Sequence, residues 1–220
     1  MKMRAKAILG TCAVLVVAGA AAELMLLPRP VPKPVAPMKD LGKNVMQQAE
    51  LEALLARAAR SLDPELRSKL AEAVLGESAR AGYDPLFVLA LVSVESRFRL
   101  TVSSERGASG LMQLKPSTFA WISAREPDIG GDDYATGEDP VVDVRLAVRY
   151  FRWLERRFQS RDDALMAYNA GPRRLRQYQR ADEIPESLRA YPRKIKHEYE
   201  RLVKMAAGER DPRLVLARAN

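Results

Sequence analysis

One glutamate lies on the apolar face of a predicted helix, where its carboxyl group could act as a general acid. Residues 86–92 are all apolar, and Glu95 follows Leu91 at i+4 and Val88 at i+7, which is the spacing of one helical face. Burial and the negative end of a helix dipole both favour the protonated carboxyl. A carboxyl that keeps its proton near neutral pH suits general acid catalysis. The alternative is a surface glutamate paired with Arg99 at i+4.

Two later segments contain side chains that could line a cleft around this carboxyl. Residues 104–113 read SERGASGLMQ, and their two glycines permit a close approach of the backbone. Residues 167–172 read AYNAGP and include Tyr168 and Asn169, a phenol and an amide able to reach a sugar or the Glu95 carboxyl. From the residues alone, a turn between helices is the favoured interpretation of the first segment, and a capped helix end is the favoured interpretation of the second.

The composition excludes several kinds of site. The 220 residues include one cysteine, Cys12, and one histidine, His197, which excludes a disulfide framework, a cysteine-based zinc cluster and a histidine-rich metal site. We therefore expect no metal ion and no organic cofactor. The net charge of +8 indicates an anionic partner or surface, but the sequence has no nucleic-acid-binding motif, and we expect no nucleic acid partner.

The N-terminal segment predicts export. Residues 1–22 combine a basic start with an uncharged apolar run that ends in small residues, which is typical of a secretory signal peptide. The apolar run resumes at residues 24–27, so retention of residues 7–27 as an inner-membrane anchor is an equal alternative. Both interpretations place the remaining chain in the periplasm.

A linker separates this segment from the body of the chain. Five prolines within residues 28–37 predict an extended polyproline stretch. We assign residues 23–60 to the linker and a leading helix, which either packs on the following domain or offers a surface to a partner. The main domain is predicted at residues 61–207 and a C-terminal tail at residues 208–220.

The body is predicted to be all-α. Aspartate precedes proline at residues 63–64, 84–85 and 139–140, a pair suited to the N-cap and first position of a helix. Apolar residues then recur with helical spacing. They form two stripes, Val144, Val148, Phe151, Leu154 and Phe158, and Ile195, Tyr199, Leu202, Val203 and Ala206. Residues 100–104 are the only strand-like segment, so we expect at most a very small β element.

The order and separation of residues 95–98 (ESRF), 104–113 and 167–172 resemble the soluble lytic transglycosylases, relatives of goose-type lysozyme. The resemblance implies a lysozyme-like fold for the main domain and a catalytic role for Glu95. A partial fourth match at residues 184–191 includes Tyr191, but Ser187 stands where the family usually has glutamate, which removes one potential sugar-binding carboxylate. The implied substrate-binding residues are Ser104, Met112, Gln113, Tyr168, Asn169 and Tyr191.

The resemblance also implies an activity and a substrate. It predicts cleavage of the bond between N-acetylmuramic acid and N-acetylglucosamine in peptidoglycan, with one carboxyl, formation of a 1,6-anhydro end, and no cofactor. Hydrolysis of the same bond by water and a non-catalytic wall-binding module are the alternatives. Residues 173–204 carry ten Lys/Arg and five Asp/Glu, a charge suited to the carboxylates of peptidoglycan strands. By analogy alone, an envelope or secretion machine is a further expected partner.

Overall fold

The computed structural model describes residues 46–129 and 137–210, and every regular element in these ranges is a helix. Short β-bridges pair Ser103 with Ser109 and Ser109 with Leu114, so the predicted all-α fold with at most a very small β element is confirmed. The predicted signal peptide, the proline-rich linker and residues 211–220 of the tail lie outside the described residues. The helices are α2 (Gln48–Ala58), α3 (Pro64–Ala81), α4 (Pro85–Ser96), α5 (Pro116–Ser123), the 3-10 helix η1 (Pro127–Ile129), α6 (Pro140–Phe158), α7 (Arg161–Ala170), α8 (Pro172–Ala181) and α9 (Glu186–Arg210).

The three described Asp-Pro pairs begin helices as predicted. Asp63 Oδ1 accepts a hydrogen bond from the Leu66 amide at 2.8 Å, and Asp84 Oδ1 accepts one from the Leu86 amide at 2.8 Å. At the start of α6, Asp139 Oδ1 accepts from two backbone amides, at 2.7 and 3.2 Å. Each carboxylate accepts hydrogen bonds from amides that have no partner within the helix. Its negative charge also interacts favourably with the positive end of the helix dipole.

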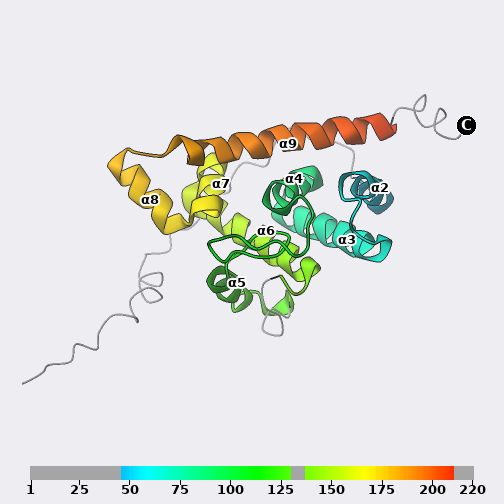
Figure 1. Cartoon of the computed structure of the whole chain (residues 1–220), viewed down its shortest axis with the longest axis horizontal. Coiled ribbons are helices and arrows are strands. Elements are labelled where there is room, and N and C mark those ends of the chain that lie inside the picture. The colour runs from blue at the N-terminus through cyan, green and yellow to red at the C-terminus, as the bar shows by residue number, and fades with distance from the viewer. Residues whose placement is uncertain (1–45, 130–136, 211–220) are drawn as a thin grey trace, which may run out of the picture. The chain divides into compact units, whose positions relative to one another are not determined.

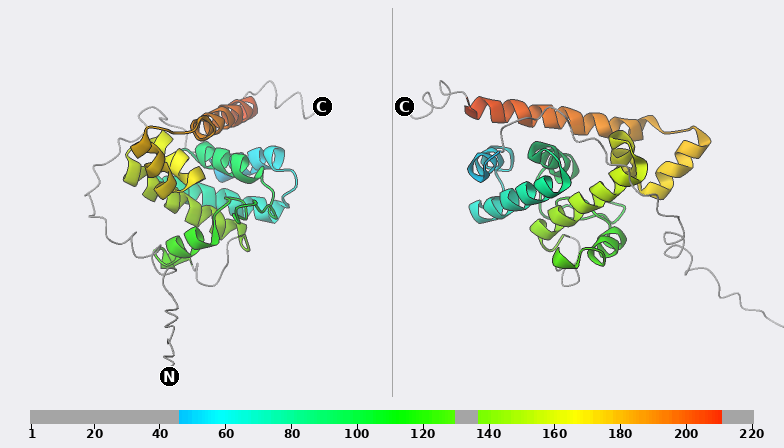
Figure 2. Two further views of the ribbon diagram at one scale, coloured as in Figure 1. Left: turned by 60° about the vertical axis from the view of Figure 1, so that its left-hand side comes forward. Right: turned by 180° about the vertical axis from the view of Figure 1, so that it is seen from behind.

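The hydrophobic core lies around α4 and α6. Helix α6 packs against α3, α5 and α7, and α9 packs along α4 and α7 (Figure 1). Seen from behind, α9 again runs across the same helices (Figure 2). Residues 86–92 of α4 are buried on every side. In the predicted α9 stripe Ile195 and Leu202 are buried, but Val203 is exposed because it lies on the flank of the stripe.

The leading helix α2 belongs to the same core. Leu51, Leu54 and Leu55 are fully buried and form part of the core cluster. Arg57 Nη2 also donates to the Met205 carbonyl at 2.7 Å, which links the end of α2 to α9. No helix within the described ranges is long and apolar enough to cross a membrane.

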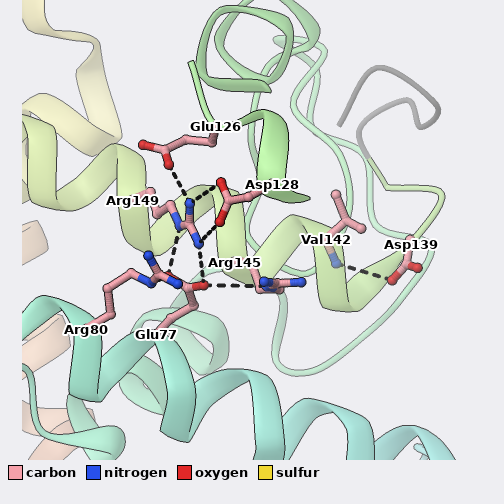
Figure 3. Close-up of polar contacts among 8 residues, drawn as sticks. All are labelled: Glu77, Arg80, Glu126, Asp128, Asp139, Val142, Arg145 and Arg149. Atoms are coloured by element: carbon pink, nitrogen blue, oxygen red, sulfur yellow. Dashed lines mark hydrogen bonds and ion pairs between the residues drawn. The ribbon is translucent and has the colours of Figure 1, made fainter. Parts of the chain in front are cut away.

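A buried cluster of charges holds the segment after α5 against α3 and α6. Figure 3 shows the Arg149 guanidinium of α6 between Glu77 of α3 and two acidic residues, Glu126 and Asp128. Arg149 Nε donates to Glu77 at 3.0 Å and Arg149 Nη1 donates to Asp128 at 2.8 Å. Arg149 is only 8% exposed, and its ion pairs with three carboxylates compensate the buried charge.

Gly110 allows the loop between α4 and α5 to touch α6. Its φ is +76°, and a Cβ atom at this position would lie 1.9 Å from Asp143 Oδ2. The Gly137 amide donates to Asp143 Oδ1 at 3.0 Å. The predicted close backbone approach is therefore present at Gly110, whereas the space around Gly107 is open.

Candidate active site

Glu95 lies in the last turn of α4, at a sharp change in chain direction. The helix ends at Ser96, and the next two residues, Arg97 and Phe98, have φ values of +54° and +60°. Positive φ is uncommon outside glycine and is tolerated where the surroundings enforce it. Here the Phe98 side chain is buried in the core, so the turn fixes the position of Glu95 at the edge of the core.

The surroundings of Glu95 raise the pKa of its carboxyl group. Burial raises its pKa to about 7, while a hydrogen bond donated by the Tyr191 hydroxyl to Glu95 Oε1 acts in the opposite direction. The alternative ion pair with Arg99 is not formed among the described residues, because Arg99 Nε donates to the Ser96 carbonyl at 3.1 Å. Glu95 can therefore exchange a proton near neutral pH.

Two tyrosines surround this carboxyl and stay protonated. Tyr191 of α9 is 5% exposed, and burial raises its pKa well above the ordinary value. Burial and then the charge of Glu95 have the same effect on the pKa of Tyr168 in α7. The Tyr168 hydroxyl donates to the Met112 carbonyl at 2.8 Å. Thus Tyr191 contacts the carboxyl, and Tyr168 fixes the neighbouring loop.

Glu95 lines a cavity of 620 Å³ between α4 and α9. The cavity brings together Glu95, Asn169 and Tyr191, which are far apart in the sequence. Its wall is completed by Ala58, Ser93, Val94, Arg97, Phe98, Lys194, His197, Glu198 and Arg201. A cavity of this size with several convergent polar groups is suited to a small molecule or a segment of a chain.

The other four predicted site residues do not line this cavity. Tyr168 holds the loop through the Met112 carbonyl, as described above, and Ser104, Met112 and Gln113 belong to the loop itself. The Met112 side chain is fully buried in the core. Gln113 has a φ of +47°, and its Nε2 donates to the carbonyls of Val102 and Gly110 at 2.8 and 3.0 Å. Ser104 Oγ accepts from the Ala108 amide at 3.0 Å and closes a turn. Their roles in substrate binding remain predictions.

Several cavity residues on α9 escaped the sequence analysis. They lie at residues 194, 198 and 201, which follow Tyr191 at intervals of three and four and therefore share its helix face. That spacing would have identified them once Tyr191 was placed at the site. The sequence pattern was instead interpreted as a general basic segment.

A second carboxylate, Glu198, shares the cavity but has a different environment. It accepts hydrogen bonds from Ser93 Oγ at 2.5 Å and from Arg201 at 2.7 and 2.8 Å. Although burial alone would raise its pKa, these bonds lower the pKa overall. Glu198 therefore stays ionised while Glu95 titrates. Within the described ranges, no group of three or more His, Cys, Asp or Glu side chains could hold a metal ion.

Comparison with known proteins gives the class of this domain. The family model described as the transglycosylase SLT domain matches residues 72–188, which is more than half of the chain. The chain therefore belongs to the transglycosylase SLT domain family. The match includes Glu95, Tyr168 and Asn169 but ends before Tyr191.

Solved structures of lytic transglycosylases share the fold. An inactive mutant of lytic transglycosylase Slt from Pseudomonas aeruginosa is 23% identical over 73% of this chain, with a TM-score of 0.51. The 70 kDa soluble lytic transglycosylase from Escherichia coli is 20% identical over 76% of this chain, with a TM-score of 0.54. A complex of a 70-kDa soluble lytic transglycosylase with bulgecin A gives a TM-score of 0.53. This chain spans about a third of the length of these proteins, covering 31 or 32% of each.

Proposed function

We propose that this protein is a peptidoglycan lytic transglycosylase that uses Glu95 as its only general acid and base. The observation that carries the proposal is the state of Glu95, a carboxyl with a pKa of about 7 that faces a cavity. Membership of the transglycosylase SLT domain family supports the same reaction. The substrate is the β-1,4 bond between N-acetylmuramic acid and N-acetylglucosamine.

The reaction needs one proton donor that later becomes a proton acceptor. Protonated Glu95 gives its proton to the glycosidic oxygen as the bond to the muramic C1 breaks, and the N-acetyl oxygen of the substrate stabilises the positive charge at C1. The Glu95 carboxylate then takes the proton of the muramic C6 hydroxyl, and O6 bonds to C1. The ring closes to a 1,6-anhydro end and no water is consumed.

The surroundings of Glu95 suit both halves of this cycle. Burial favours the acid form needed for bond cleavage, and the hydroxyl of Tyr191 stabilises the carboxylate that forms afterwards. Asn169 lies in the same cavity, where its amide can bind a sugar hydroxyl or the N-acetyl group. Proton transfer of this kind contributes typically about 10²–10⁴-fold to the rate.

Hydrolysis is the second candidate, because two carboxyls share the cavity. Most glycosidases pair an acid with a second carboxylate that acts as nucleophile or activates water. Glu198 is ionised as such a group would be, but Ser93 and Arg201 occupy its oxygens. These bonds assign Glu198 to the wall of the cavity and favour the reaction with one carboxyl.

Mass spectrometry of fragments released from purified sacculi tests the proposal. The wild-type protein is expected to release anhydromuropeptides, which are one water lighter than hydrolytic products. Glu95→Gln is expected to keep the fold, checked by circular dichroism, and to lose cleavage. Glu198→Gln is the matched control, since it neutralises the other carboxylate of the cavity and is expected to keep the anhydro product.

The other outcomes each contradict part of the proposal. Reducing-end products from the wild type, lost in Glu198→Gln, would establish a hydrolase with two carboxyls. Near wild-type turnover by Glu95→Gln would remove Glu95 from the mechanism. Binding to sacculi without release by the wild type would favour a wall-binding module.

The proposed substrate agrees with the predicted export. Peptidoglycan lies outside the inner membrane, where the predicted signal peptide or anchor would deliver residues 61–207. We infer a periplasmic location on this basis, either free or held by residues 7–27. A role with an envelope or secretion machine would place the same activity at one point in the wall.

A further inference from the structure

Two cations of the cavity wall have no anionic partner among the residues that the structure describes. Arg97, at the end of α4, and Lys194, on α9, are exposed and line the same cavity as Glu95. Neither side chain forms a hydrogen bond or ion pair within the described ranges. The second arginine of the wall, Arg201, differs because Glu198 neutralises it at 2.7 Å. The cavity therefore presents two positive charges that are available to a ligand.

Both cations follow site residues closely in the chain. Arg97 follows Glu95 by two residues, immediately after the helix end. Lys194 follows Tyr191, the hydrogen-bond donor to Glu95, by three residues on one face of α9. A separation of three residues corresponds to about 4.5 Å along a helix. A ligand bound at Glu95 therefore shares its cavity with one cation from the end of α4 and one from α9.

These cations do not serve as ion-pair partners of Glu95. A cation in contact with that carboxyl would lower its pKa, but the pKa of Glu95 is raised by burial and opposed only by the hydrogen bond from Tyr191. The two charges thus line the cavity of Glu95 without neutralising the acid. That arrangement suits recognition of an anionic part of the substrate.

We propose that Arg97 and Lys194 form a subsite for the carboxylates of the stem peptide carried by the glycan strand. This inference rests on the proposed function, which supplies the glycan strand. The muramic residue at the cleaved bond carries the peptide, so its carboxylates enter the cavity with the bond that Glu95 protonates. The subsite makes the enzyme select strands that bear charged peptides and positions them for cleavage.

Two forms of one substrate test the subsite. Native sacculi are compared with sacculi whose peptide carboxyls have been converted to amides with carbodiimide and ammonia, which keeps the peptide and removes its charge. The wild type is expected to have a higher kcat/KM on native sacculi. The ratio that is compared between proteins is kcat/KM on native sacculi divided by kcat/KM on amidated sacculi. In Lys194→Gln this ratio is expected to fall about two- to fivefold, as for a single partly exposed ion pair.

A second variant and a matched control complete the design. Arg97→Asn should lower the ratio similarly because it removes the charge. Asparagine is chosen since it tolerates the positive φ of this position. The double variant should bring the ratio close to one. Lys196→Gln is the control, because Lys196 lies on the same helix and is exposed but does not line the cavity. Its ratio should equal that of the wild type. Higher salt should reduce the wild-type ratio.

The failure of this inference is distinguishable from failure of the proposed function. An active Lys194→Gln enzyme with the wild-type ratio would overturn the subsite and leave the activity intact. If the wild type releases nothing from either substrate, the proposed function fails. In that case binding alone tests the subsite. The Glu95→Gln protein and the Glu95→Gln, Lys194→Gln double variant are each pelleted with native and with amidated sacculi, and the bound fractions are compared. Equal binding to both kinds would overturn it.

Discussion

At the scale of single residues, the central feature is a carboxyl group whose environment sets its proton affinity. Glu95 combines burial, which raises its pKa to about 7, with a hydrogen bond from Tyr191 that stabilises the anion. Glu198, in the same cavity, has donors on its carboxylate and a lowered pKa. Two carboxyls in one cavity are thereby given different protonation states, and of the two only Glu95 can donate a proton near neutral pH.

The pKa of Glu95 predicts the pH dependence of cleavage. The acid must be protonated to start the reaction, so kcat/KM should be lost as the pH rises through about 7 and fall about tenfold per pH unit above it. The measurement is the initial rate of release from sacculi between about pH 5 and pH 9. A rate that stays constant to the upper limit would contradict the assignment.

Tyr191→Phe is the matched variant for this measurement. It removes the hydrogen bond that lowers the pKa of Glu95, so the alkaline loss of activity should move to higher pH. The activity should also decrease by roughly 10²-fold, because the carboxyl is no longer held in position by the tyrosine hydroxyl. A purely structural tyrosine would change the amount of folded protein but leave the pH profile in place.

At the scale of elements, helices α4 and α9 bring the site together, and their main features follow from local sequence. Asp84 and Pro85 begin α4, and an apolar run buries it, so the location of Glu95 on the apolar face was predictable. Tyr191 came from a family resemblance. The cations of α9 share the helix face of Tyr191, so the spacing identifies them only once Tyr191 is placed at the site. Helical spacing alone does not reveal which helix that face packs against.

Contacts between distant segments were the part that the sequence did not reveal. The cluster around Arg149 joins residues that are 21 to 72 positions apart, and no local pattern links them. Met112, which the family resemblance implies as a substrate-binding residue, has its side chain buried in the core. Burial of an apolar residue depends on the packing of other segments, which a single sequence does not specify.

The loop between α4 and α5 depends on Gly110, which gives a prediction about stability. Gly110→Ala places a Cβ atom 1.9 Å from Asp143 Oδ2 and 2.8 Å from the Gly137 Cα, and it must keep a positive φ. Overpacking of this kind costs typically about 1–3 kcal/mol of unfolding free energy, measurable by urea denaturation. Gly107→Ala is the control, since its φ is also positive but its surroundings are open. Equal losses in both variants would remove the close contact as the cause.

At the scale of the whole molecule, buried carboxyls make stability depend on pH. Asp143 of α6 is buried, and its pKa is raised to about 6, in addition to the raised pKa of Glu95. A carboxyl with a raised pKa binds its proton more tightly in the folded than in the unfolded chain. Stability therefore decreases as the pH rises from the unfolded pKa to the folded one, and then stays constant.

The site itself should consequently reduce the stability of the domain at neutral pH. Glu95 has a folded pKa of about 7 against an ordinary value of 4.5, so ionisation at pH 8 costs up to about 3 kcal/mol. Glu95→Gln removes this cost while its amide oxygen can still accept from Tyr191, and it should raise the unfolding free energy at pH 8 by about 1–3 kcal/mol. At pH 4, where the acid is protonated in both states, the two proteins should be equally stable. Urea unfolding of both proteins across this range measures the difference, and Asp143, unchanged in both, cancels from it. A variant that is less stable than the wild type at every pH would show that Glu95 contributes to folding rather than being held at its expense.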